Sequence, residues 1–458
     1  MPCMSLQSHH KIALAERAAL VADYASMELP LEDLGLWRAL PIAALATAAL
    51  LIYPAAKYWI ASNEIHSDNL GKMERGAALV PGDGDAWDRL GRFEQFDFAN
   101  PDTSRALADY RKAVEDDPLS SYYWMDLASA YEDSGDLARA ADAYDHARSV
   151  YPASALTAWN YGNFLLRQQD FTGAYAQIRL AIDRDPSLLP MAISRTWRSS
   201  GDVNQLVGQV LPPNPEAYLQ ALDFLGSNRQ TDAALALWQH LAALGKPIPL
   251  PETFPFFEEL IRTDRGDDAR RVWPQALAAA GLPHDEPANH SLIWDGGFAT
   301  EFAEAGLGWR WDSPVGAEIN FDSVRPPSGT RAVRLDFTGG TNLSLDAPAQ
   351  FVPAEPGRAL HFHALMRTDE ISTDSGIRFS ITDPNHPGEV NLLTDGFIGT
   401  RPWTPVDADV TTGADTHFLV VRLVRYPSQF FDNKLSGTVW IADVSLAPSD
   451  AAAAQPSP

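Results

Sequence analysis

Hydrophobic and polar positions follow three successive patterns along the chain. Residues 39–56 contain no charged side chain. Apolar residues then recur at helical spacing as far as Gly281, and from Leu292 onward they alternate with polar residues between regularly placed turns. Helical spacing is typical of amphipathic helices, and alternation is typical of strands with one buried face. The sequence therefore predicts an apolar helix, a helical region and an all-β region, in that order.

The uncharged stretch predicts one membrane-spanning helix, which we place at residues 39–60 after an N-terminal tail of residues 1–38. At about 1.5 Å per residue, its 18 uncharged residues reach roughly 27 Å, enough to cross a bilayer core. Aromatic and cationic residues flank the stretch, as at a membrane–water interface: Trp37, Arg38, Lys57, Tyr58 and Trp59. A buried core helix is the alternative, but such helices usually carry a polar stripe, and only Thr47 is polar here.

A spacing of 34 residues recurs within the helical pattern. Small residues and a proline return at this interval, in the series Ala106, Ala140, Ala174; Ala113, Ala147, Ala181; and Pro118, Pro152, Pro186. Together with Trp124, Leu127, Ala128, Tyr131, Gly135 and Tyr144, this pattern resembles the tetratricopeptide repeat (TPR). The resemblance implies stacked helix pairs over residues 61–288, with three clear repeats followed by divergent ones.

TPR proteins present a groove to another protein, and the first helix of each repeat lines that groove. The resemblance assigns six partner-binding candidates to it: Tyr122, Met125, Ser129, Trp159, Asn163 and Arg167. Aromatic, methionine and arginine side chains often dominate binding energy at interfaces. Trp159 and Asn163 could equally tie neighbouring helices together. The lysine pattern of TPRs that clamp a peptide carboxylate is not matched, so a chaperone C-terminus is not an expected partner.

The alternating region, residues 289–449, predicts a β-sandwich of jelly-roll type. We expect strands at residues 331–337, 359–367, 376–382, 416–425 and 438–446. The motifs IWDGGFATEF, GLGWRW, RPWTPV, FLVVRLVR and GTVWIADVSL, in this order, resemble carbohydrate-binding modules. Ala299 and Ala442 stand where acidic residues of that family often hold a structural calcium ion. We therefore expect no cofactor, with calcium as the alternative.

His361 and His363 lie two residues apart on a predicted strand and so point to the same face. Such spacing could ligate a metal, but no third ligand is evident and we predict no metal site. By the same alternation, six further side chains point away from the apolar rows of their strands: Arg334, Asp336, Arg367, Arg378, Ser380 and Trp440. Polar groups beside a tryptophan suit a sugar, which makes His361, His363, Arg378 and Trp440 our glycan-binding candidates. A plain outer sheet surface is the alternative.

Composition excludes several functions. The net charge of −25 and a pI near 4.7 argue against a nucleic-acid partner, which would require clustered cations. Cys3 is the single cysteine, so no disulfide can form within the chain. No G-x-S-x-G, P-loop or H-E-x-x-H motif occurs, and we expect no catalytic residues. Residues 450–458 are expected to be disordered.

These patterns predict a membrane-anchored, non-enzymatic adaptor for cell-envelope or exopolysaccharide assembly. The alternatives are a purely structural assembly factor without a glycan ligand and, more weakly, a polysaccharide-processing enzyme. Within about 20 residues of the apolar stretch, Arg38 precedes it and Lys57, Lys72 and Arg75 follow, which favours a cytoplasmic location for the bulk of the chain. The carbohydrate-binding resemblance implies an extracytoplasmic, periplasmic location, and we adopt the latter.

Overall fold

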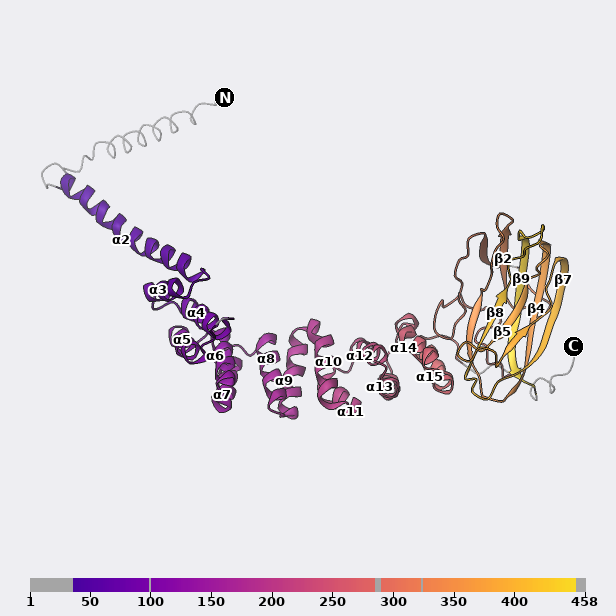
Figure 1. Ribbon diagram of the computed structural model, residues 1–458, viewed down its shortest axis with the longest axis horizontal. Coiled ribbons are helices and arrows are strands. Elements are labelled where there is room, and N and C mark those ends of the chain that lie inside the picture. The colour runs from indigo at the N-terminus through magenta and orange to yellow at the C-terminus, as the bar shows by residue number, and fades with distance from the viewer. Residues whose placement is uncertain (1–35, 99, 285–289, 323, 450–458) are drawn as a thin grey trace, which may run out of the picture. The chain divides into compact units, whose positions relative to one another are not determined.

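The computed structural model describes residues 36–98, 100–284, 290–322 and 324–449 (Figure 1). The predicted disorder of residues 450–458 and most of the predicted tail lie outside these ranges. The chain divides into two compact units, Met1–Tyr161 and Gly162–Pro458. Each unit is described by itself below.

The first unit opens with the predicted apolar helix, α2 (Leu36–Ile65). Its segment Leu40–Ile65 is long and apolar enough to cross a membrane, with a mean hydropathy of 1.5. The helix runs five residues past the predicted end of the anchor, because Ala61 and Ile65 pack in a hydrophobic cluster with residues of the next helices, including Met73 and Ala77.

The helices that follow confirm the predicted repeats. In order they are α3 (Leu70–Leu79), α4 (Gly84–Phe96), α5 (Thr103–Asp116), α6 (Ser121–Asp133), α7 (Leu137–Val150) and α8 (Ala155–Arg167), which crosses into the second unit. All six alanines of the 34-residue series are fully buried. An aspartate caps the second helix of each repeat at the same interval, at Asp102, Asp136 and Asp170. Its carboxylate accepts hydrogen bonds from backbone N–H groups of the first turn, which have no partner within the helix.

The repeats continue, with more variation, in the second unit. Their elements are α9 (Phe171–Arg184), η2 (Pro186–Leu188), α10 (Leu189–Ser200), α11 (Val203–Gln205), η3 (Leu206–Val210), α12 (Pro215–Ser227), α13 (Thr231–Ala243), α14 (Leu250–Arg262) and α15 (Gly266–Ala279). Where the 34-residue pattern weakens, η3 is a π-helix, and Arg179 Nη1 donates a 2.6 Å hydrogen bond to the carbonyl of Leu211 just beyond it. This side chain stabilises the irregular turn in the divergent region.

Two antiparallel sheets follow and confirm the predicted sandwich. The five-stranded sheet has the order β1-β2-β9-β4-β7 and the four-stranded sheet the order β3-β8-β5-β6. The strands are β1 (Ala317–Asp322), β2 (Ala332–Thr338), β3 (Ala349–Pro353), β4 (Ala359–Ser372), β5 (Arg378–Thr382), β6 (Asn391–Leu393), β7 (Gly399–Thr411), β8 (Phe418–Val424) and β9 (Ser436–Pro448). Alternate residues of both sheets, such as Val333, Phe362 and Phe379, fill one core between them.

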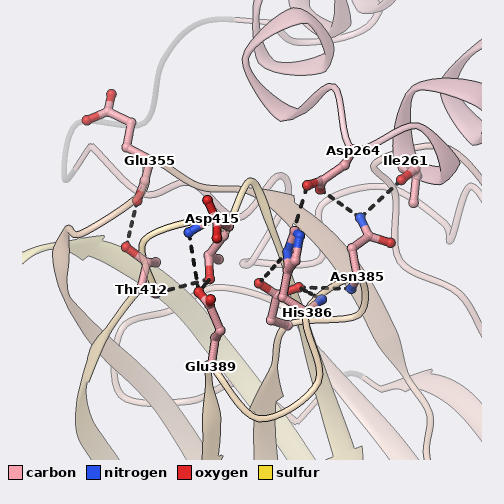
Figure 2. Close-up of polar contacts among 11 residues, drawn as sticks. Ile261, Asp264, Glu355, Asn385, His386, Glu389, Thr412 and Asp415 are labelled. Carbon is pink, nitrogen blue, oxygen red and sulfur yellow. Dashed lines mark hydrogen bonds and ion pairs between the residues drawn. The ribbon is translucent and has the colours of Figure 1, made fainter.

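The last helix pair packs directly on the sandwich within the second unit. Arg310 donates to both carboxylate oxygens of Glu258 in α14, at 2.7 and 3.3 Å. Figure 2 shows Asn385 of the β5–β6 loop pointing at the α14–α15 turn, where its Nδ2 lies 2.7 Å from Asp264 Oδ1. Trp273 of α15 meets Trp294 edge-on at 5.6 Å between ring centroids. The predicted domain boundary, after residue 288, lies within residues 285–289, outside the described ranges.

A close backbone approach completes this junction. A Cβ atom added at Gly266, the first residue of α15, would lie 2.1 Å from the carbonyl oxygen of His417. We expect Gly266→Ala to lower the free energy of unfolding by about 1–3 kcal/mol, the usual cost of overpacking a closed contact. Chemical denaturation of the purified chain would measure this. The matched control is Gly208→Ala, since no atom lies within 4 Å of the added methyl group there; equal losses for both variants would contradict the prediction.

Candidate functional site

The outer face of the five-stranded sheet collects most of the predicted glycan-binding residues. Arg334 of β2 and Arg367 of β4 each lie opposite Trp440 of β9 in the strand register. His361 and His363 lie on the same face of β4, because their neighbours Leu360, Phe362 and Ala364 point into the core. The structure therefore brings three of the four candidates to one sheet face.

Trp440 is less open than a sugar-stacking platform requires. Its side chain is only 6% exposed. The guanidinium of Arg367 lies 4.6 Å from the ring centroid and that of Arg334 lies 5.8 Å away. Asp336 accepts hydrogen bonds from Arg334 Nη2, at 2.8 Å, and from the hydroxyl of Thr438, at 2.7 Å. The indole packs in an apolar cluster with Ala332 and Ala442, against Leu365 and Trp403, and two arginines lie over its ring, one of them held by a carboxylate.

A ladder of histidines and aspartates occupies the other part of this face. His361 Nδ1 lies 2.8 Å from Asp409 Oδ1, and His363 Nδ1 lies 2.7 Å from Asp407 Oδ1. These contacts orient both imidazole rings, which stay about one third exposed. Carboxylates can accept hydrogen bonds from the hydroxyl groups of a ligand, and imidazole rings can donate hydrogen bonds to such groups or accept them. The sequence reasoning missed both aspartates because their strand, β7, was not predicted.

Arg378 does not join this face. It lies on β5, in the four-stranded sheet, and its Nε donates to the carbonyl of Gly376. Ser380, two residues further along, is buried on the same side of that sheet. Alternation correctly assigned each side chain to the side of its strand that faces away from the core, but it carries no information about which sheet holds the strand.

The aspartates nearest in sequence to Ala299 and Ala442 make hydrogen bonds within the protein. The carboxylate of Asp295 accepts the backbone N–H groups of Ala299, at 2.7 Å, and Thr300, at 2.9 Å. Asp443 accepts the hydroxyl of Thr330 at 2.6 Å. Within the described ranges, no three His, Cys, Asp or Glu side chains are arranged to hold a metal ion. The absence of a cofactor stays a prediction.

The predicted partner groove is only partly open in the first unit. Tyr122 is 55% exposed, but Met125 is 5% exposed and its sulfur accepts a hydrogen bond from Asn160. Ser129 is half-buried and accepts a bond from Gln95 Nε2 at 3.3 Å. The assignment of Met125 to the groove surface is therefore corrected: it packs between helices. Tyr122 is the exposed candidate of α6.

The remaining three groove candidates lie on α8. Trp159 is half-buried, Asn163 is buried and Arg167 is exposed. The burial of Asn163 agrees with the alternative that it ties helices together.

A buried carboxyl group lies in the seam between α4 and α6. Asp88 is almost fully buried, and Arg92 Nη2 lies 3.0 Å from one of its oxygens. The same arginine donates through Nε to Asp126 of the next repeat at 2.7 Å. Burial, followed by the nearby negative charge of Asp126, raises the pKa of Asp88 to about 8. Burial therefore favours the protonated form of Asp88 in this seam, and no sequence pattern indicated this.

Comparison with known proteins confirms the family of the helical repeats. Residues 98–155 and 126–188 match the sequence model of the tetratricopeptide repeat. Such repeats are protein–protein interaction modules. No curated protein matches the sequence.

Three solved structures illustrate how distant the similar folds are. Bacteriophage CBA120 tailspike protein 4, an enzymatically active domain, is 12% identical, with 29% of this chain and 17% of that chain covered and a TM-score of 0.23. A CBM4 structure is 16% identical, with 34% and 99% covered and a TM-score of 0.27. PilF of Pseudomonas aeruginosa is 20% identical, with 42% and 90% covered and a TM-score of 0.23. The chain thus spans 17% of the tailspike's length.

The buried Asp88 predicts a pH-dependent stability. An aspartate usually has a pKa near 3.9, so between about pH 4 and pH 8 the folded state keeps a proton that the unfolded state has released. The contribution of Asp88 to the free energy of unfolding should therefore fall as pH rises through this window, by at most about 1.4 kcal/mol per pH unit. Asp88→Asn should flatten this slope in denaturation curves recorded from pH 5 to pH 8, whereas Asp142→Asn, at an exposed site, should not. Identical slopes in all three proteins would contradict the prediction.

Proposed function

We propose that the chain is a membrane-anchored, non-enzymatic adaptor that binds a protein through its TPR groove and a glycan through the outer face of its five-stranded sheet. The observation that carries the glycan part is the concentration of polar groups on this face, contributed by four adjacent strands. It includes an arginine–aspartate pair, two histidine–aspartate pairs and a second arginine over Trp440. Sugar recognition requires such fixed hydrogen-bonding groups, placed on a rigid scaffold.

The protein-binding part rests on the repeats. TPR modules offer a preformed surface between stacked helices, and Tyr122 supplies an exposed aromatic side chain there. The strongly acidic composition favours a protein partner with basic segments and disfavours a nucleic acid as partner. The adaptor role follows from having both surfaces in one tethered chain.

We further propose that the adaptor works in the cell envelope, in exopolysaccharide or envelope assembly, with its bulk in the periplasm. Support comes from the apolar α2 helix and from the sugar-compatible sheet face. The positive charges after the uncharged stretch, Lys57, Lys72 and Arg75, favour the opposite placement. We give the sugar-compatible face more weight than these three charges.

A purely structural assembly factor is the second candidate. The observation that favours it is the covered indole of Trp440, since most polar groups of the face already satisfy one another. In this alternative, the sandwich binds no glycan and has a structural role, covering the last helices of the repeats.

Glycan binding separates the two candidates. We expect the intact protein to bind at least one member of a neutral polysaccharide panel in affinity electrophoresis, and the double variant His361→Ala and His363→Ala to bind it at least about tenfold more weakly, because two oriented hydrogen-bonding groups are lost. Arg378→Ala, on the opposite sheet, is the matched control and should bind normally. If the unaltered protein binds no glycan, the structural alternative replaces our proposal.

Protease accessibility tests the location. In spheroplasts with an intact inner membrane, added protease should digest the region after Lys57, because a periplasmic domain is exposed there. A cytoplasmic marker protein serves as the control for membrane integrity. Cleavage that occurs only after lysis would place the repeats and the sandwich in the cytoplasm and contradict the envelope role.

A further inference from the structure

The α2 helix passes from its apolar segment into the helical core of the first unit without a break. Its residues from Ala49 to Ala56 are exposed, and burial begins at Lys57, continues at Ala61 and ends at Ile65. These three positions are four residues apart and share one face of the helix. Packing on the next helix therefore starts where the uncharged stretch ends, with no spacer between them.

The next helix returns along α2 in the opposite direction. After a short turn, α3 places Gly76 against the carbonyl oxygen of Ala61 and against Ile65, so closely that a Cβ atom would lie 2.9 Å from that oxygen. Arg75 forms an ion pair with Glu64 at 3.4 Å. The 10 residues of α3 span about 15 Å, close to the roughly 12 Å along α2 from Ile65 back to Lys57. We infer from these lengths that the α3–α4 turn, residues 81–83, lies near the level of Lys57.

The following turn on the same side lies beside it. A Cβ atom added at Gly84, the first residue of α4, would lie 2.8 Å from the ring of Tyr123 and 3.0 Å from the carbonyl oxygen of Ala113. The turn between α5 and α6, residues 117–120, joins these two contact points. At its tip Leu119 is 78% exposed, although its backbone is held by Asp117, which accepts the N–H of Leu119 at 3.0 Å. We call residues 81–83 and 117–120 the anchor-side rim.

We propose that the anchor-side rim rests on the lipid headgroups and that Leu119 inserts into the membrane interface. This inference rests on the proposed membrane anchor, because an α2 helix that spans the bilayer up to Lys57 brings these turns to its surface. The carboxylates of Asp83 and Asp117 lie on the rim, where each accepts a backbone N–H bond. They repel anionic lipids, so the surface that fits is one of zwitterionic lipid. The first repeats are thereby fixed at the membrane and do not swing freely from a tether.

The test uses the full-length chain in phosphatidylcholine vesicles, with Cys3→Ser and a fluorophore on Leu119→Cys. The matched control is Leu137→Cys, which is 42% exposed at the start of α7, about 20 Å away along the 13-residue α6 helix. We expect a lipid-attached quencher to quench the label at position 119 at least about twofold more than the label at 137, since only the former meets the interface.

Three outcomes would overturn the proposal. The first is equal quenching at both positions. The second is release of the protein from membranes by alkaline carbonate, which would show that α2 does not span the bilayer. The third is stronger quenching at position 119 when anionic phosphatidylserine is added, which would contradict the preference for zwitterionic lipid.

Discussion

Close packing against glycine residues is the constraint on which the contacts between successive elements of this protein depend. Gly76 lets α3 lie against α2, Gly91 receives the ring of Tyr110 between α4 and α5, and Gly266 brings α15 against the sandwich. At each position a Cβ atom would lie within about 3.0 Å of a neighbouring atom. The apolar helix joins the repeats, and the repeats join the sandwich, through contacts that leave no room for a side chain.

Side-chain contacts reinforce one of these close approaches. In the second unit, the contact at Gly266 is accompanied by the Glu258–Arg310 pair and by the hydrogen bonds of Asn385. These contacts are directional and join α14 and α15 to loops of both sheets. A glycan-binding face on such a unit would therefore be held in a defined position relative to the last helices, which suits an adaptor better than a flexibly linked module.

Much of the fold could be predicted because the relevant signals are local. The fully buried alanines and the aspartate caps recur every 34 residues, since each repeat packs its two helices and stacks on its neighbours in the same way. The five predicted strands are β2, β4, β5, β8 and β9, which all lie inside their sheets. The four that were missed, β1, β3, β6 and β7, are the edge strands. An edge strand such as β7 has few buried positions and shows no regular apolar alternation.

The sequence by itself determined the order of the three regions, the TPR repeats and the side of each central strand on which a side chain lies, because periodicity records which positions are buried. Only the tertiary structure decided which side chains meet. It paired His361 and His363 with two aspartates of an edge strand, separated Arg378 onto the other sheet and covered Trp440 with two arginines. It also buried Asp88 beside Asp126 of the next repeat. Such contacts join residues far apart in the chain, and sheet order and helix stacking, which local pattern does not encode, bring them together.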